Sequence, residues 1–138
     1  MRCVSILFLI VLAGCSADLL PSSTGGAVST TITSVVKTDS GVTLSVNVTN
    51  SDTGAIAYSS YCPGVVQRLA GSWAPISDTP TVCRATAKSI EPGGSVTFVA
   101  AESKAAIGYD VRFVFNWLWL NGNGPVGGTS TSQAVNVE

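Results

Sequence analysis

The chain has 138 residues, the length of one domain, which argues against a two-domain enzyme with an interdomain cleft. Hydrophobic residues make up 46% and charged residues only 11%, while Ser and Thr number 32, so hydroxyl groups rather than charges cover the surface. The net charge of −1 excludes the basic surface that nucleic-acid binding requires. The sequence has no His, which removes the usual general base, the Ser-His-Asp triad and most zinc sites.

Residues 1–14 have the pattern of a secretory signal. Arg2 supplies a positive charge, and the apolar run that follows is shorter than the roughly 20 residues needed to span a bilayer. The tetrapeptide Leu12-Ala13-Gly14-Cys15 resembles the lipobox of bacterial lipoproteins. The resemblance implies that residues 1–14 are removed and that Cys15 is acylated. The alternatives are a signal peptide cut elsewhere and an uncleaved anchor helix.

A lipidated Cys15 implies an extracytoplasmic protein that is attached to a membrane through its lipid. Ser16 follows the cysteine directly and no Asp stands there. This resembles lipoproteins that are sorted to the outer membrane when the host has one.

The four cysteines have separate roles in this interpretation. Cys3 leaves with the signal and Cys15 carries lipid, so Cys62 and Cys83 remain as one even pair in an oxidising compartment. A disulfide that closes the twenty residues between them stabilises the fold by roughly 3 kcal/mol. A redox or metal role would require a CxxC spacing or further ligands, so neither a metal nor a cofactor is predicted.

Residues 15–27 are predicted to be a lipidated, flexible tether. The stretch is rich in Ser, Gly and Pro without strand or helix periodicity, and its twelve residues after Cys15 reach roughly 20 Å. In the alternative, Leu19 and Leu20 pack on the domain as an extra edge segment.

Residues 28–138 are predicted to form a single all-β domain. Apolar and polar residues alternate from Val42 to Thr49, the period of a strand with one buried face. Turn signals at 39–41 and 91–94 bound neighbouring strands, the second with Pro and Gly where a type II turn needs them. About seven strands are expected, at residues 29–37, 42–49, 55–62, 82–87, 95–101, 108–115 and 129–137. This pattern is typical of a Greek-key β-sandwich.

Several residues resemble those of bacterial immunoglobulin-like domains on secreted and lipid-anchored proteins, a group that includes the fold of the bacterial intracellular proteinase inhibitors. They are Asn50, Cys62, Trp73, Cys83, residues 90–95 and residues 108–116. The resemblance implies an immunoglobulin-like sandwich with one disulfide, in which the Tyr109 hydroxyl closes a tyrosine corner. The chain departs from the antibody pattern because its two cysteines bracket a loop rather than pin the centres of opposed strands.

The segment between the cysteines is a candidate binding loop. A constrained loop that presents Arg68 and Leu69, with Trp73 nearby, would suit an inhibitor of a trypsin-like protease. The alternative is a strand at 65–69 and a turn at 70–72, with Trp73 packed on the disulfide.

Trp117 and Trp119 are two residues apart, so on a strand they face the same side and form a candidate aromatic platform for a glycan. The alternative is that they fill the core. Asp110 and Arg112 are expected on the outward side as a solvated charge pair.

The sequence shows no acid-base pair and no nucleophile motif, so it predicts a protein that is not an enzyme and has no evident small-molecule substrate. The expected function is a lipid-anchored, extracytoplasmic binding or structural module of the bacterial cell envelope, with a protein partner there. The alternatives are a protease inhibitor that acts through the Cys62–Cys83 loop and a glycan-binding module.

Overall fold

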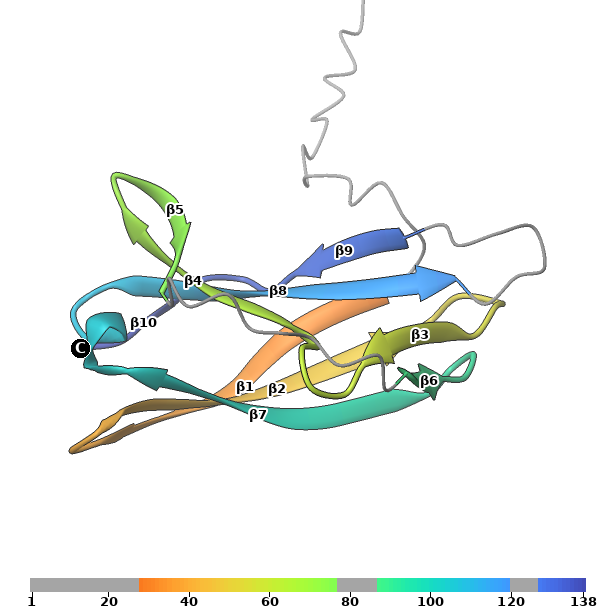
Figure 1. Ribbon diagram of the computed structural model, residues 1–138, viewed down its shortest axis with the longest axis horizontal. Coiled ribbons are helices and arrows are strands. Elements are labelled where there is room, and N and C mark those ends of the chain that lie inside the picture. Colours follow the sequence, from red (N-terminus) through yellow and green to blue (C-terminus); the bar gives the residue numbers. More distant parts are fainter. Residues whose placement is uncertain (1–27, 77–86, 120–126) are drawn as a thin grey trace, which may run out of the picture.

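The computed structural model describes residues 28–76, 87–119 and 127–138. The fold is all-β, and its strands form two antiparallel sheets that face each other (Figure 1). No helix within these ranges is long and apolar enough to cross a bilayer. The elements are β1 (Val28–Thr38), β2 (Gly41–Asn50), β3 (Ile56–Ser59), β4 (Gly64–Ala70), β5 (Ser72–Pro75), β6 (Ala87–Ile90), β7 (Ser95–Ser103), the 3-10 helix η1 (Lys104–Ala106), β8 (Asp110–Trp119), β9 (Gly127–Thr131) and β10 (Val135–Asn136).

The first sheet has the order β1-β2-β7. Its central strand, β2, alternates as predicted, because its apolar residues are buried and the polar residues between them are only partly buried. β2 pairs with β7 without a register shift from Gly41↔Ser103 to Thr49↔Ser95. β1 pairs with β2 through a bulge between Ile32 and Ser34.

The second sheet is built around β8. Its order is β5-β4-β8-β3-β6, and β9 and β10 also pair with β8. Val114 of β8 pairs with Val65 of β4 and with Thr131 of β9, so these strands lie on opposite edges of β8. β8 is therefore the central strand that positions the residues around it.

The core lies between the two sheets. Phe98 of β7 contacts two rings of β8, with centroid distances of 5.3 Å to Phe113 and 6.2 Å to Phe115. Tyr58 of β3 adds a third aromatic contact, 5.6 Å from Phe115. Because residues of both sheets share this one apolar cluster, the predicted all-β sandwich is confirmed at the level of two packed antiparallel sheets.

Both predicted turns are confirmed. β1 and β2 form a hairpin that closes at Thr38↔Gly41. In the turn at 91–94, Gly93 has a φ of 75° and the Gly94 N–H donates to the Glu91 carbonyl over 2.8 Å. Pro92 and Gly93 thus occupy the positions that a type II turn requires.

Two predicted strands are wrong in extent. The strand expected at 55–62 ends at Ser59, because the chain then bends away from β8 and returns only where Pro63 accepts a hydrogen bond from the Asn116 N–H. The strand expected at 129–137 is split into β9 and β10 at the buried Ser132, whose hydroxyl accepts from the Phe113 N–H over 2.9 Å. The strand expected at 82–87 lies outside the described residues except for its last residue, which begins β6.

Candidate functional site

The candidate binding loop contains a β-hairpin. β4 and β5 pair at Leu69↔Trp73 and Ala70↔Ser72, and Gly71 lies between them with a φ of 78°, which a residue without a Cβ adopts freely. The hairpin projects from the body of the sandwich (Figure 1). The predicted strand at 65–69 and turn at 70–72 are therefore confirmed.

Arg68 is directed toward the end of the sandwich rather than into solvent. Its partner on β8 is the buried Val111, so both side chains lie on the core side of the sheet. One guanidinium nitrogen of Arg68 donates to the Ala105 carbonyl over 2.9 Å, and the group lies 4.9 Å from the centre of the Tyr109 ring. These contacts tie the hairpin to the segment around η1. Arg68 is thus engaged by its own domain.

Tyr109 does not form the predicted corner among the described residues, where its hydroxyl has no hydrogen-bond partner. Its ring instead contacts Arg68, and its carbonyl accepts from the Val137 N–H over 3.1 Å. Tyr109 thus helps to hold the end of the chain against β8.

On the outer face, Gln67, Leu69 and Trp73 of the hairpin lie beside Arg112 of β8, and we name these four side chains the hairpin patch. The pairs Gln67↔Arg112 and Leu69↔Trp73 place all four on the outer face of the second sheet. The Arg112 Nε donates to the Gln67 Oε1 over 2.9 Å, and the guanidinium lies 4.2 Å from the centre of the Trp73 ring. Leu69 is 39% exposed beside them.

The hairpin patch differs from the predicted arrangement in one respect. Arg112 was expected to pair with Asp110, yet Asp110 accepts from the Asn136 amide over 2.8 Å and Arg112 binds Gln67. Sequence alternation placed Arg112 outward but gave no signal for its neighbours, because these depend on which strand lies beside β8.

The chemistry of the hairpin patch suits a protein surface. Trp and Arg are the residue types that dominate the binding energy of protein interfaces. Arg112 is held in place by its hydrogen bond to Gln67 and its cation–π contact with Trp73, so less side-chain entropy is lost when it binds a partner. Its terminal N–H groups make no hydrogen bond to another described residue and can donate to a carboxylate or a carbonyl.

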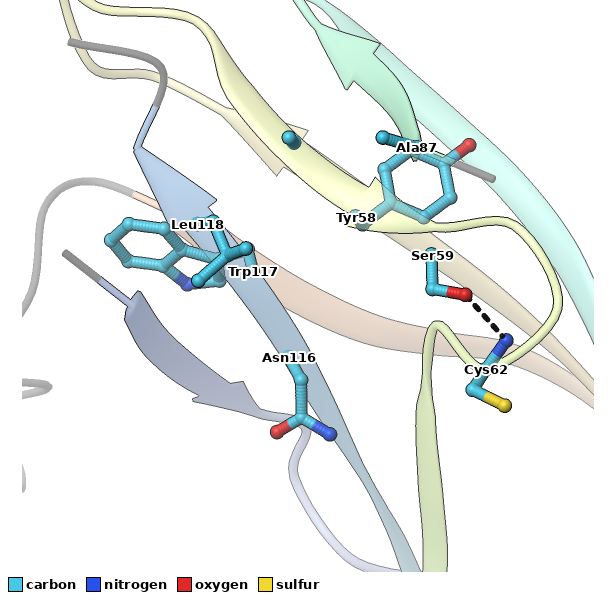
Figure 2. Close-up of a pocket in the computed structure, with 8 residues that line it drawn as sticks. Tyr58, Ser59, Cys62, Ala87, Asn116, Trp117 and Leu118 are labelled. Atoms are coloured by element: carbon cyan, nitrogen blue, oxygen red, sulfur yellow. Dashed lines mark hydrogen bonds between the residues drawn. The ribbon is translucent and has the colours of Figure 1, made fainter. Parts of the chain in front are cut away.

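A cavity of about 320 Å³ lies between β3 and β8 (Figure 2). β3 pairs with β8 only at Ile56↔Trp119 and Ala57↔Leu118, and the ladder resumes at Gly64↔Phe115. The gap between these two ladders forms the cavity. Its lining residues are Ala57, Tyr58, Ser59, Cys62, Ala87, Asn116, Trp117 and Leu118.

Trp117 is only 3% exposed, and it packs within the sandwich on the core side of β8. The alternative in which it fills the core is confirmed. The Trp119 side chain lies outside what the structure describes. Because stacking on a sugar needs an open ring face, the burial of Trp117 counts against the glycan platform.

Cys62 lies in the wall of the cavity, where its N–H donates to the Ser59 hydroxyl over 3.2 Å (Figure 2). Cys15 and Cys83 lie outside the described residues, so the lipidation and the Cys62–Cys83 disulfide stay predictions. Within the described ranges, no three His, Cys, Asp or Glu side chains gather in a way that would hold a metal ion.

No protein family, curated protein or solved structure matches the chain.

Proposed function

We propose that this protein is a lipid-anchored, extracytoplasmic, non-catalytic module that binds a protein partner at the bacterial cell envelope. The support for the location is the lipobox-like tetrapeptide Leu12-Ala13-Gly14-Cys15 behind a short apolar run. In this proposal Cys15 carries the lipid, residues 16–27 hold the domain off the membrane, and Cys62 and Cys83 form a disulfide.

The domain in this proposal is an immunoglobulin-like Greek key. The order in which the chain alternates between the two sheets supports this topology. It passes from β2 in the first sheet to β3 and β4 in the second, returns to pair β7 with β2, and then places β8 beside β3 and β4. A later strand that returns beside an earlier one is the defining feature of a Greek key.

The observation that carries the binding role is the fixed geometry of the hairpin patch. An exposed Leu69 lies beside a Trp73 ring that is covered by the Arg112 guanidinium at 4.2 Å. The hairpin is tied to the body through Arg68, which limits its motion relative to the sandwich. A partner that offers an apolar side chain and an acidic or carbonyl group fits this surface.

The test is a crosslinking pull-down from intact envelopes, which compares the wild type with Cys15→Ala, Trp73→Ala and the matched surface variant Val36→Ala. We expect one protein partner with the wild type and Val36→Ala, and a loss of at least about tenfold with Trp73→Ala, equivalent to 1.4 kcal/mol. Cys15→Ala should release the protein from the membrane fraction and lose the partner. Recovery of no specific partner by the wild type, or equal recovery by Trp73→Ala, would contradict the proposal.

The protease-inhibitor alternative makes a different prediction. It assigns the primary contact with the protease to Arg68, whose guanidinium donates a hydrogen bond to the Ala105 carbonyl. If the loop inhibits a trypsin-like protease, Arg68→Ala should abolish inhibition in an activity assay while Trp73→Ala retains part of it. We place this alternative second, because the contacts of Arg68 with Ala105 and Tyr109 must break before a protease can bind its side chain.

A further inference from the structure

The two sheets have several edge strands in the described part of the chain, and all but one are short, bulged or interrupted, or carry Lys or Pro. β1 has a bulge between Ile32 and Ser34, and Lys37 lies near its end. β5 and β6 have four residues each and contain Pro75 and Lys88 respectively. β9 starts with two glycines, and the break before β10 interrupts the edge. Short strands, bulges, lysine and proline are the devices that protect sheet edges.

β7 is the exception. It has nine residues without Lys, Arg, Pro or Gly, and its ladder with β2 is continuous. Val99 at its centre is 65% exposed, the highest value among large hydrophobic side chains in the described ranges. Its one charged residue, Glu102, is half-buried, and this desolvation raises the pKa of its carboxyl group above the ordinary value. β7 thus offers a long, regular edge along one border of the first sheet (Figure 1).

We propose that β7 is the edge through which two copies of this chain join, with the two β7 strands paired antiparallel about Val99. The contact is isologous, as expected of a twofold dimer, and it joins the two three-stranded sheets into one continuous sheet.

The sequence of β7 is complementary to itself in this register. The two exposed Val99 side chains lie opposite each other, and Thr97 lies opposite Ala101 of the second copy. On the core side, the large Phe98 lies opposite the small Ala100 of the second copy. Glu102 lies opposite Val96, so no like charges oppose each other.

Opposite charges meet at both ends of the paired strands. The register pairs Ser103 with Ser95 of the second copy, so Lys104, the first residue of η1, lies at the end of the strand pair where Gly94 of the second copy precedes β7. Gly94 is in the same tight turn as Glu91, since its N–H donates to the Glu91 carbonyl over 2.8 Å. Both Lys104 and Glu91 are exposed, and the twofold axis generates this charge pair twice.

The dimer is compatible with the lipid anchor and with the hairpin patch. Val28 pairs with Asn50 and Ser95 with Thr49, so β1 begins at the Ser95 end of β7. The two domains therefore begin at opposite ends of the paired β7 strands, each of which is roughly 30 Å long. Tethers that reach roughly 20 Å allow both anchors to enter one membrane when β7 runs along its surface. The hairpin patch belongs to the other sheet and stays open.

The test uses the full-length chain in its own membrane. Val99→Cys places two thiols opposite each other across the twofold axis, whereas Val36→Cys places one on the opposite edge strand of the same sheet, where 53% of Val36 is exposed. We expect a disulfide-linked homodimer on non-reducing gels with Val99→Cys, and a yield at least about tenfold lower with Val36→Cys. Equal yields would overturn the proposal, as would crosslinking of Val99→Cys to a different protein only.

Two further comparisons test the register. Coexpressed Thr97→Cys and Ala101→Cys chains should crosslink to each other more than either does to itself. In the Val99→Cys background, Glu91→Lys and Lys104→Glu should each lower the dimer yield, and the double variant should restore it. A double variant that is no better than the singles would rule out this register. These results are independent of the hairpin-patch pull-down, so the two proposals can fail separately.

Discussion

Asn50 is the clearest case of a single polar residue that organises the fold. It is fully buried at the end of β2. Its amide nitrogen donates to the carbonyls of Gly54 and Ile90 over 2.9 and 3.0 Å, and its amide oxygen accepts from the Asp52 N–H over 3.1 Å. One side chain therefore satisfies three backbone groups and fixes the chain where it leaves the first sheet.

Asn50→Ala should lower the free energy of unfolding by about 2–3 kcal/mol, because it leaves backbone groups without partners in a buried place. Denaturant unfolding followed by circular dichroism measures the change. Asn47→Ala, which removes an exposed amide bonded to the Thr97 hydroxyl, is the matched control and should cost less than about 1 kcal/mol. Similar losses for both variants would show that burial of Asn50 does not matter.

The pairing of β8 with β9 depends on a close contact between an aromatic ring and a glycine. Trp117 lies opposite Gly128, and a Cβ on Gly128 would stand 2.4 Å from the indole ring. The ring therefore occupies the space that any larger residue would need. At the neighbouring Gly127, a Cβ would meet the end of the flexible Leu118 side chain at 3.1 Å.

Gly128→Ala should destabilise the protein by about 1–3 kcal/mol, because the indole must shift in a packed core. Gly127→Ala should have a clearly smaller effect, since Leu118 is exposed and can move. Thermal unfolding, together with tryptophan fluorescence of the folded state, measures both. A larger effect at Gly127 would contradict this account of the strand pair.

The strands differ in how well their bounds could be predicted from the sequence. β2 and the first part of β8 were predictable, because alternation of apolar and polar residues reports one buried face directly. The early end of β3 was not, because it depends on Pro63 meeting the Asn116 N–H, a contact between distant parts of the chain. The position of Arg112 on Trp73 depends in the same way on β4 lying beside β8.

The molecule as a whole is held together by one apolar core that both sheets share. Phe115 is fully buried and lies 6.2 Å from Phe98 of the first sheet and 5.6 Å from Tyr58. Leu118, on the opposite face of the same strand, is 48% exposed. Substitutions at these two positions therefore compare how much the shared core and the outer surface contribute to the free energy of unfolding.

Phe115→Ala should lower the free energy of unfolding by about 3–5 kcal/mol, because it removes a large ring and leaves a cavity between the sheets. Leu118→Ala should change it by about 0.5 kcal/mol or less. Equilibrium unfolding in urea measures both values. Comparable effects would mean that the two sheets do not share one core.

The all-β class, the two tight turns and the inward residues of the central strands could be predicted from the amino-acid sequence alone. These are local properties, since a period of two and the φ preferences of Pro and Gly act over a few residues. That Arg68 is engaged by Ala105, that Trp117 is buried and that β7 is an edge strand of the first sheet among the described residues becomes visible only in the folded chain. Each of these depends on which distant strand lies alongside, and that choice is made by packing the whole core rather than by any short stretch of chain.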